Sequence, residues 1–145
     1  IVYQAKYMDK NIQVFSADID ESLEPGLSLY GAKHLVANSA EIDFKSHIFD
    51  AVITEVPFSL DALDDICNTL NNLDKHLHQS ARIVMMFSEQ QLKSIKKYVK
   101  MLNWYIVKSA HVNRKGTDVV VMLIVKSYKM YEKAKKIGEL LKYIS

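Results

Sequence analysis

Two carboxylates stand directly after apolar, strand-like runs, where α/β proteins commonly bind ligands. Asp18 follows the run 11–17, and its two oxygens can accept both hydroxyls of a ribose, which is a vicinal diol. The alternative is that Asp18 only ends its strand in a polar turn. Glu55 follows the run 49–54, and Phe58 comes three residues later. A carboxylate oxygen can accept hydrogen bonds, and an aromatic ring can stack.

The elements that must position these residues alternate between strands and helices. Short apolar runs indicate strands, and apolar residues that recur every three or four positions indicate helices. The predicted strands are 11–17, 34–37, 49–54, 82–87, 104–110 and 118–125. Five helical segments are predicted: the end of a helix at 1–9, a short helix after Glu24-Pro25, and helices that begin after Ser59, after a capping box at 88–91, and at 130. Ser59 is expected to cap the third of these, and the last extends over 130–144. The apolar stripe of the third helix is Leu63, Ile66, Leu70, Leu73 and Leu77.

This order of elements predicts an α/β fold. Strands separated by helices imply right-handed crossovers and a mainly parallel sheet. Strands 11–17, 49–54 and 82–87 should therefore be parallel neighbours in one sheet. The turn at 113–116 predicts a hairpin, which adds an antiparallel pair at one edge. We expect a single domain over residues 1–145.

A parallel α/β sheet that ends in an antiparallel hairpin resembles the class I, Rossmann-like fold of S-adenosylmethionine-dependent methyltransferases. The resemblance extends over residues 11–126. It implies that Asp18 binds the ribose of the S-adenosylmethionine cofactor and that Ile19 packs against the adenine.

The segment 36–44 is similar to the family stretch in which an acidic residue, followed by alanine, binds the adenine amino group. Ser39 and Ala40 occupy those two places here. A serine hydroxyl can accept the hydrogen bond, but a neutral acceptor contributes less than a charged one. Glu41 or Asp43 could supply the contact from a shifted register, or the segment is a plain surface loop.

The segment 49–58 resembles the strand and turn of methyltransferases that modify exocyclic amines of nucleobases, most closely the tRNA guanine-N2 methyltransferases and related predicted DNA or RNA methylases. Those families carry Asn or Asp, then two prolines, then Tyr or Phe. A base amine is a poor nucleophile because its lone pair is delocalised into the ring. In these families a side-chain oxygen and a backbone carbonyl accept its two hydrogens, while the aromatic ring stacks on the flipped base. The corresponding residues here form the tetrad Glu55, Val56, Pro57 and Phe58.

The tetrad, which the resemblance implies to be catalytic, departs from the family pattern at two positions. Glu55 has one methylene more than Asp, which moves its oxygens by roughly 1 Å, and misplacement of that size can cost about 100-fold in rate. Val56 keeps its backbone carbonyl but lacks the rigid ring of proline.

The glycine-rich cofactor loop of the family is absent. That loop follows the first strand of the family fold and lets the backbone approach the cofactor closely. We expect the missing first strand and loop to lie upstream of Ile1 in a longer protein, of which this chain is the C-terminal part; alternatively the chain is a remnant. The four glycines, none of them spaced as such a loop, are Gly26, Gly31, Gly116 and Gly138.

Composition excludes several other classes of protein. The single cysteine, Cys67, rules out a disulfide framework and fits a reducing, cytoplasmic compartment. No apolar run approaches the ~18–20 residues that a membrane span needs. His76 and His78 are two residues apart, the wrong spacing for one helical face, so no metal site is predicted.

Charge is divided unevenly along the chain. Residues 1–87 contain six Lys/Arg and thirteen Asp/Glu, whereas residues 88–145 contain thirteen Lys/Arg and four Asp/Glu. The basic half predicts a surface that meets nucleic-acid phosphates, although lysine-rich exposed helix faces are an equal explanation.

The resemblance implies an S-adenosylmethionine-dependent N-methyltransferase that acts on a nucleobase exocyclic amine in RNA, with tRNA favoured over DNA. The alternative is a catalytically inactive methyltransferase-like domain that binds RNA or a partner subunit, or works with an upstream domain. The altered residues Ser39, Glu55 and Val56 favour the alternative, whereas Asp18 and the intact Pro57-Phe58 pair favour the enzyme.

Overall fold

The computed structural model describes residues 11–18, 21–23, 32–36, 41 and 43–144. The chain forms two compact units, Ile1–Asp43 and Phe44–Ser145. The helical segments predicted at 1–9 and after Glu24-Pro25 lie outside the described residues.

The first unit contains a pair of parallel strands, β1 (Val14–Asp18) and β2 (Ala32–Val36), and a short 3-10 turn, η1 (Glu21–Leu23). Asp18 is the last residue of β1 and pairs with Val36, the last residue of β2. The two strands therefore end level with one another. Both predicted strands are present, although β1 begins three residues later than expected.

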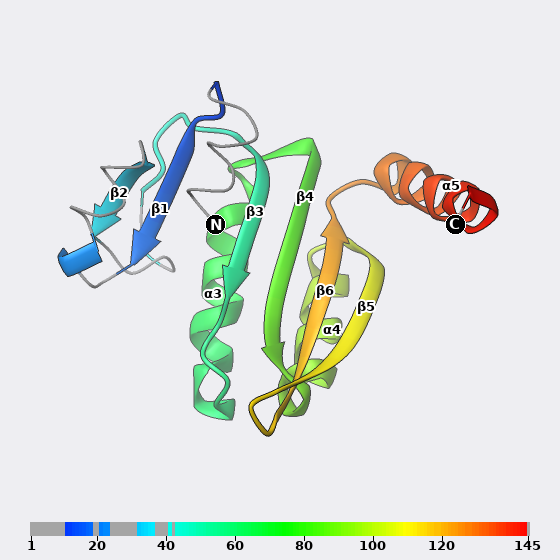
Figure 1. The fold of residues 1–145 in the computed structure, drawn as a ribbon. Coiled ribbons are helices and arrows are strands. Elements are labelled where there is room, and N and C mark those ends of the chain that lie inside the picture. The colour runs from blue at the N-terminus through cyan, green and yellow to red at the C-terminus, as the bar shows by residue number, and fades with distance from the viewer. Residues whose placement is uncertain (1–10, 19–20, 24–31, 37–40, 42, 145) are drawn as a thin grey trace. The chain divides into compact units, whose positions relative to one another are not determined.

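The second unit contains a four-stranded sheet in the order β3-β4-β6-β5 (Figure 1). β3 is parallel to β4, and β6 is antiparallel to both β4 and β5. The parallel pairing of 49–54 with 82–87 and the terminal hairpin are thus confirmed. The place of strand 11–17 in this sheet stays a prediction. The four strands are β3 (Phe49–Glu55), β4 (Leu77–Ser88), β5 (Tyr105–Arg114) and β6 (Thr117–Val125).

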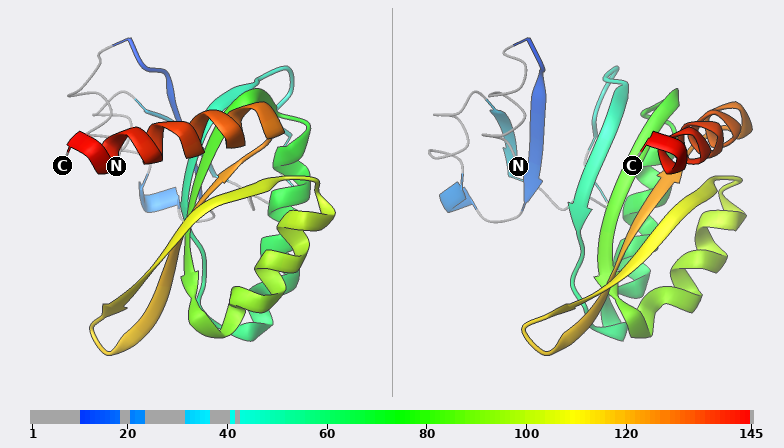
Figure 2. Two further views of the ribbon diagram at one scale, coloured as in Figure 1. Left: turned by 90° about the vertical axis from the view of Figure 1, so that its right-hand side faces the viewer. Right: turned by 45° about the vertical axis from the view of Figure 1, so that its right-hand side comes forward.

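Two helices, α3 (Leu63–Asp74) and α4 (Leu92–Met101), cover one face of this sheet (Figure 2). Their apolar stripes supply the predicted core residues Ile66, Leu70, Ile95 and Val99, all at most 3% exposed. The strands contribute the apolar residues of the same face, at 0–1% exposure: Ile83, Met85, Phe87, Val120, Met122 and Ile124. This layer is the hydrophobic core that holds the ends of β3 and β4 in place.

Two details of the predicted α3 helix are wrong. The Ser59 side chain makes no capping bond, because a 3-10 turn, η2 (Leu60–Ala62), precedes the helix. Leu77 belongs to β4, because the backbone N–H of His76 bonds to the carbonyl of Leu73 and ends the helix first. Leu77 is still buried, so its apolar character fits either the stripe of a helix or the start of a buried strand.

The last helix, α5 (Tyr128–Ile144), contacts β5 through its first half. Tyr105 lies 5.7 and 5.9 Å, between ring centroids, from two tyrosines of the first turn, Tyr128 and Tyr131. Further along, Ile137 and Leu140 are 48% and 62% exposed. Among the described residues, no helix is long and apolar enough to cross a membrane.

The β5–β6 hairpin closes through a two-residue turn, Lys115-Gly116, with φ values of 52° and 86°. Positive φ at both turn residues matches the right-handed twist of the strands. The Asn113 side chain supports the turn by donating to Asp118 at 2.9 Å and accepting from the Gly116 N–H at 3.1 Å. At the other end, the β5–β6 ladder is interrupted between Ile106 and Lys108.

Gly116 and Gly138 provide matched Gly→Ala substitutions, because a Cβ at either position meets no atom within 4 Å. At the positive φ of Gly116, alanine is strained, so Gly116→Ala should lower the free energy of unfolding by about 1–2 kcal/mol. Gly138 lies inside α5, so Gly138→Ala should raise it by about 0.5–1 kcal/mol. Thermal unfolding should show melting temperatures that move in opposite directions; a parallel shift would contradict the hairpin geometry.

Candidate active site at the end of strand β3

The tetrad lies where β3 leaves the sheet. Glu55 is the last residue of β3 and is level with Met86 of β4. The N–H of Val56 donates to the carbonyl of Met86 at 3.0 Å, which extends the ladder by one residue. Pro57 cannot continue that ladder because it has no N–H. Glu55 and Pro57 are exposed, and Val56 and Phe58 are half-buried.

Side chains from the end of β4 hold the carbonyls that follow. Gln91 Nε2 donates to the carbonyls of Pro57 at 2.8 Å and Ser59 at 2.7 Å. The carbonyl of Phe58 accepts from Ser88 Oγ at 2.7 Å and Gln90 Nε2 at 2.8 Å. Three consecutive carbonyls are thus occupied by the turn η3 (Glu89–Gln91) and the residue before it.

The amide of Gln91 has a partner for each of its polar functions. Its Oε1 accepts the N–H of Ser88 at 3.0 Å, as the predicted capping box requires. Its Nε2 makes the two bonds to the tetrad loop. The side chain is 0% exposed, and a buried amide is favourable only when its donors and acceptor are all paired. The sequence indicates the capping bond but not the two bonds across to the loop.

Two oxygens of the tetrad are left for a ligand. Within the described residues the carbonyl of Val56 accepts no hydrogen bond, and Oε2 of Glu55 has no partner. The neighbouring carbonyls of Pro57, Phe58 and Ser59 are already bonded, so they are not available to a ligand. The loop therefore presents two acceptors from consecutive residues.

Arg114 is a site residue that the sequence did not reveal. Its Nη1 donates to Glu55 Oε1 at 2.6 Å and lies 3.6 Å from the Met86 sulfur. Arg114 ends β5, the far edge strand, and is 59 residues from Glu55. The turn of the β5–β6 hairpin lies at the end of the sheet where β4 finishes (Figure 1), and Arg114 is the last residue of β5 before that turn. No local motif signals a contact that depends on the twist of a hairpin.

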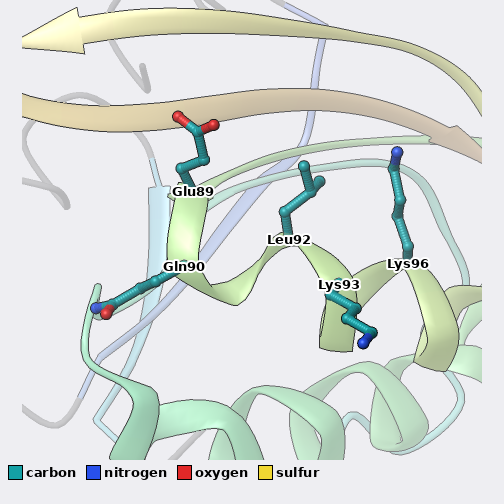
Figure 3. A pocket seen from close by; sticks show the side chains of 5 residues that line it. All are labelled: Glu89, Gln90, Leu92, Lys93 and Lys96. Carbon is teal, nitrogen blue, oxygen red and sulfur yellow. The ribbon is translucent and has the colours of Figure 1, made fainter.

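A shallow pocket of about 380 Å³ lies beside the tetrad loop, and no tetrad residue lines it. Three lining side chains, Glu89, Leu92 and Lys96, extend toward the β5 and β6 strands, whereas Gln90 and Lys93 extend elsewhere (Figure 3). Gln90 connects the pocket to the tetrad, since it also donates to Phe58. Three of the five lining residues carry charges, which are of both signs: Glu89, Lys93 and Lys96.

The residues predicted to bind the cofactor belong to the first unit. Asp18 ends β1, as the sequence indicated, and is level with the end of β2. Ile19, Ser39 and Ala40 lie outside the described residues. The carboxyl ends of two adjacent parallel strands are where open α/β sheets bind ligands, so the position of Asp18 fits the ribose contact.

The glycines that the structure describes do not form a cofactor loop. Gly116 is in the hairpin turn and Gly138 is inside α5. The described part of the chain also holds no group of three or more His, Cys, Asp or Glu placed to bind a metal ion.

Comparison with solved structures identifies the fold. TrmN from Thermus thermophilus superposes with a TM-score of 0.73 at 15% identity, over 87% of this chain and 40% of that one. An rRNA methylase from Streptococcus thermophilus gives a TM-score of 0.61 at 13% identity, over 79% and 73%. The chain has a Rossmann-like methyltransferase fold. The fold class predicted from the sequence is confirmed.

A third protein with this methyltransferase fold, magnesium protoporphyrin IX methyltransferase from Synechocystis PCC 6803, was solved with bound S-adenosylmethionine. It superposes with a TM-score of 0.64 at 13% identity, over 86% of this chain and 62% of that one. The chain covers only part of these proteins, and it spans 40% of the length of TrmN from Thermus thermophilus. At such identities the likeness shows the fold. No protein-family model matches the chain, and no curated protein matches it in sequence.

Cys67, in α3, is a half-buried thiol outside the tetrad. Burial, and to a lesser extent the nearby Asp64 carboxylate, raise the pKa of this thiol above its ordinary value. A raised pKa lowers the thiolate fraction at neutral pH. Alkylation by iodoacetamide at pH 7.5 should therefore be slower than for free cysteine and should accelerate in urea. If Cys67 were alkylated at the same rate in the native protein as in urea, the thiol could not be half-buried.

Gln91→Leu should destabilise the chain because it leaves the carbonyls of Pro57 and Ser59 and the N–H of Ser88 without partners. A buried unpaired group such as the Ser88 N–H costs about 1–3 kcal/mol, and the two carbonyls lose part-buried bonds, so the free energy of unfolding should fall by about 2 kcal/mol. Gln90→Leu is the matched control. Gln90 is exposed, and the Phe58 carbonyl to which it donates keeps its hydrogen bond from Ser88 Oγ. The loss of unfolding free energy should therefore stay below about 1 kcal/mol. Urea denaturation measures both; equal losses would refute the role given to the buried amide.

Proposed function

We propose that this chain is part of an S-adenosylmethionine-dependent N-methyltransferase that acts on an exocyclic amine of a nucleobase in RNA. The observation that carries the proposal is the pair of acceptors in the tetrad, Glu55 Oε2 and the Val56 carbonyl. An exocyclic amine has two hydrogens to donate, and these two oxygens come from adjacent residues at the end of a parallel strand.

The tetrad would act on the amine by positioning it. Hydrogen bonds from the two amine hydrogens to oxygen acceptors favour a geometry in which the nitrogen lone pair is less delocalised and can attack. Phe58 would stack on the base and hold it in the plane of these acceptors, at about 1–3 kcal/mol per stacked base. The occupied carbonyls of the loop keep the acceptors in place before substrate arrives.

The cofactor would be held by the first unit. S-adenosylmethionine supplies the methyl group that the amine accepts. Asp18, at the end of β1, would accept the two ribose hydroxyls, with Ile19 against the adenine and Ser39-Ala40 near its amino group. This assignment rests on the strand-end position of Asp18 and on the structurally similar methyltransferase that contains bound cofactor.

RNA is the proposed substrate for two reasons. One neighbouring structure is named as an rRNA methylase. The chain also exposes four lysines on one helix, α4, which has no acidic residue: Lys93, Lys96, Lys97 and Lys100. Such a surface attracts a phosphate backbone and makes binding depend strongly on salt. Within RNA, tRNA is proposed ahead of other classes because the tetrad is most similar to that of tRNA guanine-N2 methyltransferases.

Glu55→Ala in the full-length protein should abolish methyl transfer to RNA and leave S-adenosylmethionine affinity nearly unchanged, because the lost contact is with substrate. Phe58→Ala should weaken substrate engagement by about 1–3 kcal/mol. Asp50→Ala, which removes another exposed carboxylate of β3, is the control and should retain activity. The assay is transfer of labelled methyl from the cofactor to total RNA, with calorimetry for cofactor binding.

The same assay on total DNA and on total RNA separates the enzyme from an inactive RNA-binding domain. The enzymatic proposal would be wrong if the wild-type protein transferred methyl to neither pool but still bound RNA in a salt-sensitive way. Glu55→Asp combined with Val56→Pro restores the family-like pattern and should leave activity similar or raise it.

A further inference from the structure

The ion pair between Arg114 and Glu55 occupies half of the carboxylate that the proposed reaction needs. Arg114 Nη1 bonds to Oε1 of Glu55 at 2.6 Å. Both side chains are about half exposed, at 51% and 52%. An ion pair with this exposure shifts an equilibrium by a factor of only about 1 to 5, because water screens the charges and both side chains lose freedom. The pair is therefore easy to exchange.

The surroundings of Arg114 favour an anion from outside the chain. Within the described residues, Glu55 is the acidic residue that bonds to Arg114. The carboxylate of Asp118, on the neighbouring strand, accepts a hydrogen bond from Asn113 instead. The adjacent turn residue, Lys115, is exposed and basic. The remaining N–H groups of the guanidinium point from a fixed fork, a geometry that matches two oxygens of a phosphate.

We propose that Arg114 exchanges its bond to Glu55 for a phosphate of the substrate backbone, and that this exchange frees Oε1 of Glu55, so that both carboxylate oxygens can receive the target amine. This inference rests on the proposed function. The exchange requires little energy, because the exposed pair that is broken contributes only a factor of about 1 to 5 and a substrate held by its other contacts brings a phosphate beside the guanidinium. Oε2 of Glu55 has no partner within the described residues in either state, whereas Oε1 is released when a backbone phosphate takes its place on Arg114. The substrate class is thus a polynucleotide, and free nucleosides are disfavoured by about two- to fivefold because they bring no phosphate to Arg114.

The test compares two substrates made from one RNA pool: the intact RNA, and the same RNA digested and dephosphorylated to nucleosides. Wild-type full-length protein should methylate the intact RNA and transfer less to the nucleosides. Arg114→Gln should lower transfer to RNA by about tenfold or more, because the phosphate contact is lost. It should raise transfer to nucleosides by about two- to fivefold, because Oε1 of Glu55 is no longer occupied.

Lys115→Gln is the matched control, since it removes one positive charge from the neighbouring position of the same turn. It should weaken RNA binding slightly and leave nucleoside transfer as in the wild type. Fluorescence anisotropy with a labelled RNA provides a readout independent of turnover. The slope of log affinity against log salt should fall by about one for Arg114→Gln.

Opposite effects of Arg114→Gln on the two substrates support the exchange. An equal loss with both substrates would show that Arg114 only holds Glu55 in place, and no change with either would show that the ion pair is incidental. Both results overturn the inference and leave the proposed function standing. If the wild-type protein transfers methyl to neither pool, the proposed function fails and the inference fails with it.

Discussion

The buried amide of Gln91 is the constraint on which the candidate site depends. β3 and β4 are parallel, so their carboxyl ends lie side by side, and each strand must turn there into a helix. A turn between a strand and a helix exposes several backbone groups that neither element can pair. Gln91 pairs three such groups at once, two carbonyls after β3 and the N–H of the last residue of β4. The two turns are thereby tied together, and the tetrad cannot move without breaking bonds in a buried place.

This arrangement explains how the loop can keep its shape with a single proline. In the families that the tetrad resembles, two successive prolines restrict the turn. Here Val56 replaces one of them, and hydrogen bonds to three consecutive carbonyls take over part of that restriction. The carbonyl that escapes these bonds belongs to Val56 itself. Part of the rigidity thus comes from the end of β4 and from η3 rather than from a second proline ring, and it leaves an acceptor open at the substituted position.

The features that depend on a few neighbouring residues could be predicted from the sequence. The apolar run before Glu55 and the capping box at Ser88 and Gln91 are each written in a few neighbouring residues, and both are present in the structure. Leu77 was misplaced because a helical stripe and the first residue of a buried strand are equally apolar. Boundaries of this kind depend on where backbone hydrogen bonds stop, which side-chain character does not determine.

Contacts between distant parts of the chain were not recoverable. The bonds from Gln91 to the tetrad loop join residues 32 and 34 positions apart, and the Arg114–Glu55 pair joins residues 59 apart. Neither contact has a local signature, because glutamine and arginine each occur in many sequence contexts that lack such a partner. Their partners follow from the register of β3 on β4 and from the twist of the hairpin. Those two features become visible only in the assembled sheet.

The outer edge of β5 has a consequence for how the molecule behaves in concentrated solution. A long, flat and apolar edge strand is a template on which a second chain can add, and such addition leads to aggregation. This edge instead carries Lys108, His111 and Arg114, and its ladder is irregular between Ile106 and Lys108. Charged side chains would have to lose water, and an incoming strand would have to follow the irregularity and the twist. The sheet is therefore protected against growth at β5, and strand-by-strand self-assembly is disfavoured along that side.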